Sequence, residues 1–533
     1  MAVLETNSTK KIVAVFNSRM QDMLDQYREW SSLATHFGPK RMEHNPLNPP
    51  ARSKAFNSEK VYDPKPILCA KMLGLAISSF MAPQTTYWYA FAPIDGAIRK
   101  PSREERQWCY GLREKVSQLL ASSGFYRAFL ESCQDKVVFG PSYMVRMLVG
   151  NRYFVKHIPF YQIVPVRDFW GEYRGFYRVF WKTAEQIRDQ FGIEVRGKKG
   201  DDLCKVLHYV NPRSESSVLP QIFEWESQYI AVDTFQVLSQ GGYRGNLYIP
   251  GSWDEPKELK ESTGVAYNHL ASARILQNYA REMLASGMLK NRPPTIWPNQ
   301  DMTLAPEYVP GAIWYYDSIK GEPKPVDLGM DPRTVESQYI QLHKGFEDGF
   351  YLSYILPILF REGSSPYKAA EVWAKRDDAF RVIGQQINAI EREDLSPVLL
   401  STAEMLIKYR LYDPPPKSMG NTPIHVEYSS AADLALRSSE LEPINRWLQF
   451  FQVAASFDSR SLATIDVDYM LRKAERVLQM DPLVLKDEQS VQAALRKMEQ
   501  EQTLQQLATA GTAVREFGQG AAGFARADGG VGA

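Results

Sequence analysis

Seven prolines lie between Pro293 and Pro325, and this segment separates two stretches whose sequences favour helices. A proline inside a helix removes a backbone hydrogen bond and clashes with the preceding turn, so the segment cannot be helical. The flanking stretches 262–289 and 332–356 have helical patterns. We therefore expect the order helix, compact β-rich insert, helix.

A third long helical pattern follows the second. The aromatic run FYLSYILPILF at 350–360 leads through a polar loop, REGSSPYK, into this pattern, which continues to about Tyr409 and ends before Pro414. One face is apolar, as in a core helix with a solvated opposite face; its residues are Ala369, Val372, Trp373, Phe380, Ile383, Ile387 and Ile390. A core helix explains that face, but it leaves the order of the modules unexplained.

The rest of the chain mixes helical and strand-like regions. Helices are predicted at 15–34, 65–82, 183–191 and 489–517, with a helix pair at 103–132 that breaks at Ser122-Ser123-Gly124. Strands and turns are predicted at 87–91, 137–181 and 203–249. The last residues, 518–533, are rich in Gly and Ala and are predicted to be disordered. The fold class is therefore mainly α with β-rich modules (α+β).

Charge and cysteine content exclude several kinds of protein. The chain has 63 basic and 62 acidic side chains, for a net charge of +1, whereas a protein that coats nucleic acid would be strongly basic. Its cysteines are far apart and form no CxxC pair, so neither a disulfide framework nor a zinc site is predicted, and a reducing compartment fits. The N-terminus has no apolar leader, and we expect no signal peptide.

Two segments superficially suggest membrane spans. Met72–Pro93 carries no charge but contains several Ser, Thr and Gln residues and Pro83, and the run 350–360 is too short to cross a bilayer. We expect no membrane partner.

Motifs for chemistry are also weak. Gly518, Gly520 and Gly523 match a dinucleotide fingerprint, but the motif follows a predicted helix and leads to the chain end instead of lying between a strand and a helix. No histidine lies within five residues of another, and no GxSxG, P-loop or Cys–His arrangement occurs. Tyr173–Trp181 interleaves aromatics and arginines, a pattern that can stack on single-stranded nucleic acid, but an amphipathic strand with its arginines outward is the favoured explanation. No catalytic residue, metal site or cofactor is predicted.

The order of the modules resembles that of the portal (head-to-tail connector) proteins of tailed bacteriophages, in particular the short-tailed, T7-like kind. AKMLGLAISSFMAPQTTYWYAF near the start looks like the family's early wing helix, and the segment from Asp168-Phe169-Trp170-Gly171 to Gly192 resembles its wing. The most specific match is Arg361-Glu362-Gly363 followed by Ala369-Ala370-Glu371-Val372 at the head of a long helix. Glu427-Tyr428-Ser429-Ser430 and Ile465-Asp466-Val467-Asp468 are similar to the C-terminal part.

This resemblance implies a portal fold with clip, stem, wing and crown that assembles as a ring, dodecameric in the family. The implied divisions are an N-terminal wing region (1–261), first stem helix (262–289), clip (290–331), second stem helix (332–356), tunnel loop (357–368), long wing helix with C-terminal wing (369–480), crown helix (481–517) and disordered tail (518–533).

The resemblance also implies a channel for double-stranded DNA, and it makes Arg361, Glu362 and Lys368 the candidates for the tunnel loop. Pro366 and Tyr367 depart from the more basic or small residues of relatives at this loop. A strongly basic bore would bind phosphates tightly and stall translocation, so a near-neutral chain fits a conduit. On the first stem helix, Arg274 and Arg281 share a face and are candidates either for the channel or for the subunit interface.

The Pro-rich insert is the candidate docking surface for the packaging motor. Trp297, Trp314, Tyr315 and Tyr316 are of the type enriched at interfaces, although they could instead form the insert's own core. No Walker A sequence is present, so the motor would be a separate terminase large subunit. The other implied partners are further copies of the chain, the major capsid and scaffolding proteins, and tail adaptor or nozzle proteins. The implied location is the virion, with the host cytoplasm during assembly.

Two other readings keep the same helices. A large helical scaffold or adaptor would lack the channel, and particle shape separates it from a portal. An enzyme with an unrecognised site would show metal- or nucleotide-dependent activity in a screen.

Overall fold

The structure is a computed structural model that describes residues 2–42, 49–50, 61–94, 101–150, 152–214, 217, 219–257, 260–292, 295–298, 313–316, 332–353, 355, 384–420 and 422–428. The predicted tunnel loop, the first part of the long helix, the C-terminal wing beyond residue 428, the crown helix and the tail lie outside the described residues.

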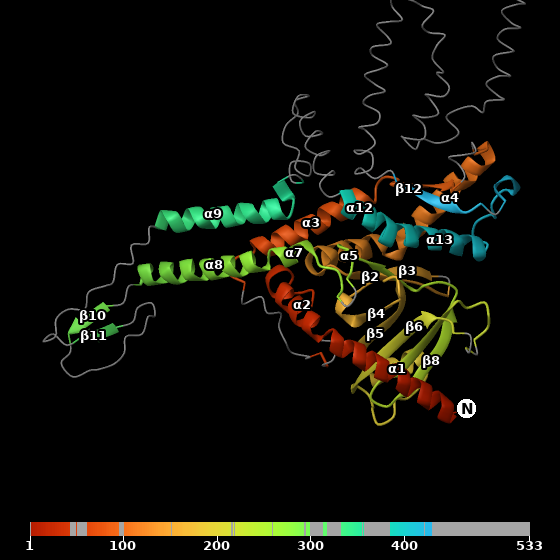
Figure 1. Cartoon of the computed structure of the whole chain (residues 1–533), viewed down its shortest axis with the longest axis horizontal. Coiled ribbons are helices and arrows are strands. Elements are labelled where there is room, and N and C mark those ends of the chain that lie inside the picture. Colours follow the sequence, from red (N-terminus) through yellow and green to blue (C-terminus); the bar gives the residue numbers. More distant parts are fainter. Residues whose placement is uncertain are drawn as a thin grey trace, which may run out of the picture.

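The N-terminal helix is divided in two. The pattern predicted one helix at 15–34, whereas α1 (Ala2–Asp22) and α2 (Leu24–Phe37) meet at Met23. Their buried residues include Phe16, Tyr27, Trp30 and Phe37, and the Tyr27 hydroxyl donates to the backbone oxygen of Tyr161, 2.7 Å away. This side chain therefore fixes α2 to the β-rich part of the body. Figure 1 shows α2 beside the strands.

Three further helices form the centre of the body. They are α3 (Lys65–Met81), α4 (Arg103–Ser123) and α5 (Phe125–Phe139). The N-terminus of α4 is a capping box in which Ser102 and Glu105 satisfy each other's backbone amides. Gly124, at φ 82°, separates α4 from α5, which confirms the break predicted at this glycine.

Antiparallel strands cover one side of these helices. One sheet has the order β3–β2–β9, from β2 (Ser142–Val149), β3 (Arg152–Ile158) and β9 (Tyr248–Gly251). The other has the order β4–β5–β6–β7–β8, from β4 (Ile163–Arg167), β5 (Tyr173–Thr183), β6 (Leu203–Pro212), β7 (Trp225–Ala231) and β8 (Gln236–Tyr243). The short helix α6 (Ala184–Phe191) packs on the larger sheet through Ala184 and Ile187.

His208 links the two sheets. This β6 residue is buried, with Nδ1 2.7 Å from the Tyr248 hydroxyl on β9 and Nε2 2.8 Å from the Ser227 hydroxyl on β7. Burial, with a smaller contribution from Arg178, holds the pKa of His208 well below its usual range. The imidazole is therefore neutral and serves as a structural hydrogen-bonding group.

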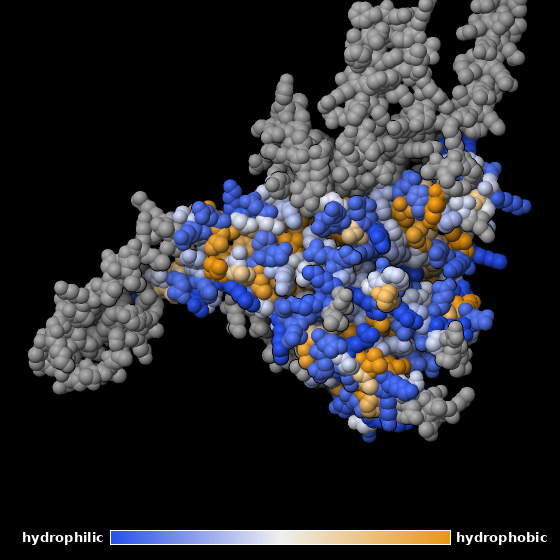
Figure 2. All heavy atoms as spheres, in the orientation of Figure 1, coloured by the Kyte–Doolittle hydropathy of each residue, from blue (hydrophilic) through white to orange (hydrophobic). Residues whose placement is uncertain are grey.

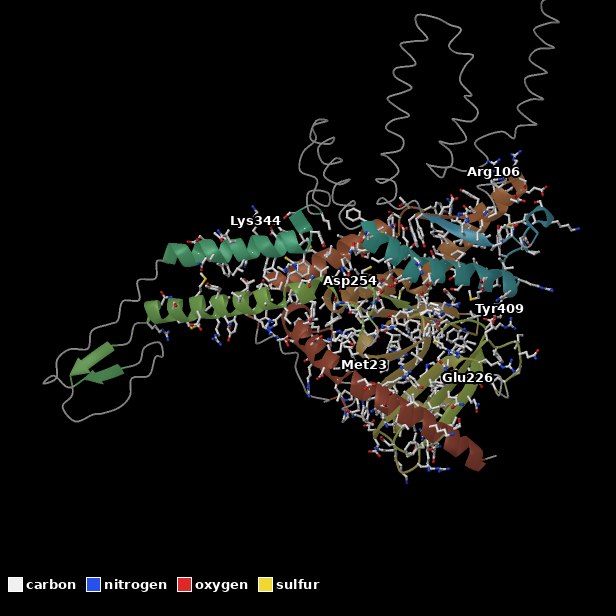
Figure 3. All side chains as sticks on the ribbon, viewed as in Figure 1. Met23, Arg106, Glu226, Asp254, Lys344 and Tyr409 are labelled. Carbon is white, nitrogen blue, oxygen red and sulfur yellow. The ribbon has the colours of Figure 1, made fainter. Side chains whose placement is uncertain are left out.

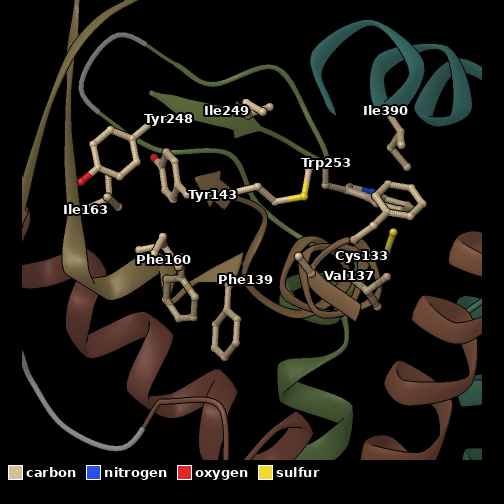
Figure 4. Close-up of a cluster of buried hydrophobic side chains, with 14 of the residues drawn as sticks. Cys133, Val137, Phe139, Tyr143, Phe160, Ile163, Tyr248, Ile249, Trp253 and Ile390 are labelled. Carbon is tan, nitrogen blue, oxygen red and sulfur yellow. The ribbon is translucent and has the colours of Figure 1, made fainter. Parts of the chain in front are cut away.

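The main core lies where helices and sheets meet. Phe139 stacks on Phe160 with ring centroids 4.1 Å apart, and Tyr143, Trp253 and Ile390 extend the cluster (Figure 4). These residues come from α5, the short 3-10 helix Phe160–Gln162 between β3 and β4, β2, the loop after β9, and the helix α12 (Gly384–Ile390). The main core is thus one continuous apolar cluster built from distant parts of the chain, and a smaller second cluster lies between α6 and the larger sheet.

The predicted order of helix, insert and helix is present. The first helix begins later than expected and is interrupted. It consists of α7 (Val265–Asn268) and α8 (Leu270–Asn291), which are separated at His269. The φ of −104° and ψ of 5° at His269 lie outside the helical region. In the insert, β10 (Thr295–Pro298) and β11 (Ile313–Tyr316) pair in parallel. The second helix, α9 (Pro332–Gly349), ends earlier than the predicted residue 356, because Tyr351 adopts a φ of 57°.

The structure describes the predicted third long helix only from Gly384 onward, and one of its turns contains an extra residue. A π-turn, Glu391–Leu395, joins α12 to α13 (Ser396–Lys408), and β12 (Ile424–Tyr428) then returns to pair with β1 (Tyr89–Pro93). Ile387 and Ile390, both predicted on the apolar face, are buried. No helix among the described residues is long and apolar enough to cross a membrane.

A buried ion pair attaches this turn to the body. Lys136 on α5 pairs with Asp394, and both side chains are 1% exposed. On the same turn, Glu393 Oε2 accepts hydrogen bonds from the Ser252 amide at 2.8 Å and the Ser252 hydroxyl at 2.7 Å. The π-turn therefore orients the consecutive residues Glu393 and Asp394 so that each carboxylate meets a partner on the body.

We expect Lys136→Met to lower the free energy of unfolding by about 3–5 kcal/mol, because it leaves a buried carboxylate without its partner. The double variant Lys136→Met/Asp394→Leu removes both charges and should recover most of that loss. Urea unfolding measures both effects. The control is Lys408→Met, whose exposed pair with Glu404 at 3.5 Å should contribute less than about 1 kcal/mol. A double variant no more stable than the single one would contradict this account.

Candidate functional site: the projecting helix pair and its base

Helices α8 and α9 leave the body side by side and carry the insert at their far end (Figure 1). Near the body, α8 buries Ala273, Leu276 and Gln277, and α9 buries Phe346. Farther out, every residue of α8 from Arg281 to Met288 is exposed. Side chains of both helices point into open space, whereas those of the body pack against each other (Figure 3). The pair is therefore supported chiefly at its base.

The exposed part of the pair is unusually apolar. Ile275, Met283, Leu284 and Met288 on α8 and Ile340 on α9 are between 42% and 59% exposed. A hollow of about 400 Å³ lies between the helices, lined by residues that include Ile275, Tyr279, Leu342 and Phe346. Hydrophobic side chains are visible among hydrophilic ones along this projection (Figure 2). Such a surface is typical of a region that another protein covers.

Asp63 is the centre of the base. Its Oδ2 accepts a hydrogen bond from the Tyr339 hydroxyl and lies 2.6 Å from His343 Nε2, and both of these residues belong to α9. On the α8 side, Gln277 Oε1 accepts from the Asp63 amide at 3.0 Å, and Gln277 Nε2 donates to the Asp63 carbonyl at 2.7 Å. One buried residue ahead of α3 thus holds both projecting helices.

The environment of Asp63 favours its charged form. Burial alone raises the pKa of this carboxyl, but hydrogen bonds from Tyr339, the Lys65 amide and His343, together with the charge of His343, outweigh burial and lower the pKa below its usual value. Close by, Lys65 forms an ion pair with Glu347 of α9. The base is therefore polar and satisfied, which suits a junction that must hold one geometry.

The structure places two of the predicted residues on the projection. Arg274 Nη2 donates to the Ser32 hydroxyl of α2 at 2.7 Å, and Arg281 pairs with its neighbour Glu282 at 3.0 Å. Both arginines are exposed. Arg274 thus contacts its own chain while remaining open to solvent, and the choice between channel and subunit interface stays open.

The other predicted residues are less fully described. Trp297 stands opposite Tyr315, and Trp314 and Tyr316 lie on the same strand β11, so the backbone brings the four aromatics together on one two-stranded ribbon. Arg361, Glu362 and Lys368 lie outside the described residues. No group of metal-ligating side chains occurs in the part of the chain that the structure describes.

Sequence reasoning missed Asp63, Gln277 and His343. Asp63-Pro64 directly before a helical pattern is a signal for a helix start, and the Asp63 carboxylate does accept from the Lys65 amide at 2.8 Å. That signal predicts only a local role. It contains nothing about Gln277 or His343, which are more than 200 positions away.

A family model of bacteriophage head-to-tail connecting proteins matches residues 7–485. The chain belongs to this family. The prediction of a phage head-to-tail connector is therefore confirmed, whereas the T7-like type stays a prediction. The family is one of structural proteins of the phage particle, which associates this connector with the virion.

One relative and one solved structure illustrate the similarity. The chain is 21% identical over 427 residues to a probable portal protein of Bordetella phage BPP-1, and the match covers 76% of each protein. A chain in the virion of a native gene transfer agent particle matches with 10% identity and a TM-score of 0.31, covering 78% of this connector and 89% of that chain. A TM-score this low carries no argument about the fold.

We expect Asp63→Asn to destabilise the base by about 1.5–3 kcal/mol at pH 7, because hydrogen bonds to a charged partner are lost. Because the folded-state pKa of Asp63 lies below the unfolded value, the stabilisation is present above that unfolded value, about 4, and disappears as the pH falls through the folded-state pKa.

Urea unfolding at a series of pH values measures the difference between wild type and variant. That difference should shrink in acid. Asp25→Asn is the control, because Asp25 is 89% exposed and forms an ion pair with the exposed Arg28. A stability difference that does not change between pH 7 and acid would contradict a charged Asp63.

Proposed function

We propose that this connector forms the ring-shaped portal channel at a capsid vertex, through which double-stranded viral DNA is packaged and later ejected. The observation that carries the proposal is the apolar surface of the projecting helices, from Ile275 to Met288 on α8 and at Ile340 on α9. Most helical stability in proteins comes from the packing of an apolar face, and here that face is open. Neighbouring copies arranged around an axis would cover it.

The shape of the chain supports a closed ring. Head-to-tail contacts between identical subunits close into rings when the rotation allows it, and each subunit then offers two different surfaces. In a ring, the pair α8 and α9 would provide such surfaces on its opposite sides. In this arrangement the pair is the stem, the insert with β10 and β11 is the clip, and the sheets form the wing. A ring of twelve subunits is the number that the family resemblance implies.

The remaining roles follow from this arrangement. Arg361 and Lys368, flanking the loop at 357–368, would be repeated by symmetry into rings of positive charge that centre the duplex through phosphates. Glu362 beside them would limit the net charge of the ring. The aromatics Trp297, Trp314, Tyr315 and Tyr316 would meet the terminase motor and later the tail proteins at the far end of the stem. Capsid and scaffolding proteins would surround the wing.

Purified full-length protein should form closed rings with a central hole in negative-stain images. We expect Leu284→Asp/Met288→Asp to shift the population to monomers, because buried unpaired carboxylates would face the neighbouring subunit. Mass photometry measures the shift. The control is Leu411→Asp, which adds a charge at an exposed residue outside the projection and should leave the rings intact. A wild-type protein that stays monomeric at micromolar concentration would refute the ring.

Arg361→Ala/Lys368→Ala should still form rings but should package or retain less DNA, with a defect that depends on salt because phosphate contacts are screened. DNA protected from nuclease in a packaging reaction provides the measurement. Rings of the double variant that package and retain DNA like wild type would remove these residues from the channel. Loss of the rings themselves would point to a structural role instead.

A further inference from the structure

The hairpin between β4 and β5 presents two large aromatic side chains to solvent. Phe169 is 91% exposed and Trp170 is 83% exposed. Their rings contact each other edge to face, with centroids 5.1 Å apart and planes at 89°. Single exposed apolar residues are common, but two adjacent aromatics this exposed form a protruding apolar surface that calls for a partner.

The turn holds its shape without these two side chains. Asp168 Oδ1 accepts hydrogen bonds from the Trp170 amide at 2.9 Å and the Glu172 amide at 3.0 Å, and the Asp168 amide donates to the Glu172 carbonyl at 2.9 Å. Gly171 supplies the φ of 85° that the turn requires. Because the backbone and Asp168 determine the turn, the folding of the chain gives no reason for aromatic residues at its tip.

The turn is also rigidly attached to the body. Arg167, just before it, forms an ion pair with Glu261 at 2.7 Å, and both side chains are nearly buried. Arg167 Nη1 also donates to the Lys257 carbonyl at 2.9 Å. The Glu261 carbonyl accepts a hydrogen bond from Gln26 Nε2 of α2, and the Glu261 amide donates to Gln26 Oε1. Glu261 lies just ahead of α7 and α8. The aromatic tip is thus fixed relative to the segment from which the stem helices start.

A hollow lies beside the tip. Its volume is about 630 Å³, and its lining includes Trp170, Tyr173, Trp253, Arg146 and Arg392. A chain segment that enters this hollow would contact the indole of Trp170 on its way in. Binding hot spots in protein interfaces typically combine an aromatic anchor with an adjacent pocket. A preorganised turn also loses little conformational entropy on binding.

We propose that Phe169 and Trp170 are an anchor by which one copy of this chain binds the adjacent copy in the assembled ring. This inference rests on the proposed function. Two observations favour a second copy as the partner. Arg167, at the base of the turn, pairs with Glu261 at the start of the segment that leads to α7 and α8, so the turn is tied to the part of the chain that forms the proposed stem interface. A ring also requires each subunit to offer two different surfaces to its neighbours, and this exposed aromatic tip on a preorganised turn can supply part of one of them.

The first test compares assembly over a range of protein concentrations by mass photometry, with the full-length chain. Phe169→Ser/Trp170→Ser should raise the concentration at half-assembly by about tenfold or more, while the melting temperature of the monomer stays unchanged because Asp168 still holds the turn. Phe169→Tyr/Trp170→Tyr keeps the aromatic area and should assemble like wild type. Val149→Ser is the matched control, since Val149 is 56% exposed at another hairpin.

The outcomes separate the two proposals. If wild type forms no rings, the proposed function fails. If wild type forms rings and the serine double variant assembles equally well, or no worse than Val149→Ser, the ring stands and the anchor is refuted.

The second test identifies the surface that the tip contacts. A photoreactive phenylalanine analogue at position 169 is cross-linked in rings assembled from a mixture of ¹⁴N-labelled and ¹⁵N-labelled chains. Cross-linked peptides that combine both isotopes would support the anchor, because they join two copies. The anchor would be overturned if every cross-linked peptide pair carried a single isotope, or if position 169 cross-linked to no peptide of this chain.

Discussion

The carboxylate of Asp63 is the contact on which the direction of the projecting helices depends. It joins the start of α3 to Tyr339 and His343 of α9, while its backbone is bound by Gln277 of α8. A helix of 22 residues is about 33 Å long, so a rotation of 10° at the base displaces the far end by roughly 6 Å. A single satisfied hydrogen-bond network at the base therefore positions the insert at the far end.

Buried charges hold the rest of the body in register. Lys136 and Asp394 join α5 to the π-turn, and Arg167 and Glu261 join the β4–β5 hairpin to the segment before α7. Buried ion pairs contribute little net stability, because each charge loses its hydration. Their consequence is specificity, since any other packing would leave a charge buried and unpaired. The two pairs therefore hold the π-turn and the β4–β5 hairpin in one arrangement relative to the helices.

Sequence patterns predicted the local elements well where local chemistry decides them. The prolines of the insert required a non-helical segment between two helices, and Gly124 ended α4 as expected because it adopts a left-handed conformation. The break at His269 and the early end of α9 were missed. His269 packs against Phe350, with ring centroids 5.4 Å apart, and Phe350 also contacts Phe37 of α2 at 5.8 Å. These tertiary contacts override the helical pattern.

The sequence by itself determined the order of the modules, because prolines, glycines and helical periodicity act over a few residues. It also determined the membership of the connector family, through a match over residues 7–485. Only the tertiary structure decided which residues meet at the base of the projecting helix pair, since Asp63, Gln277 and His343 are brought together by the packing of three helices. It also decided that Phe169 and Trp170 are exposed. A Phe-Trp pair in a strand-rich region would ordinarily be assigned to a core, and exposure depends on where the hairpin turns relative to the folded body.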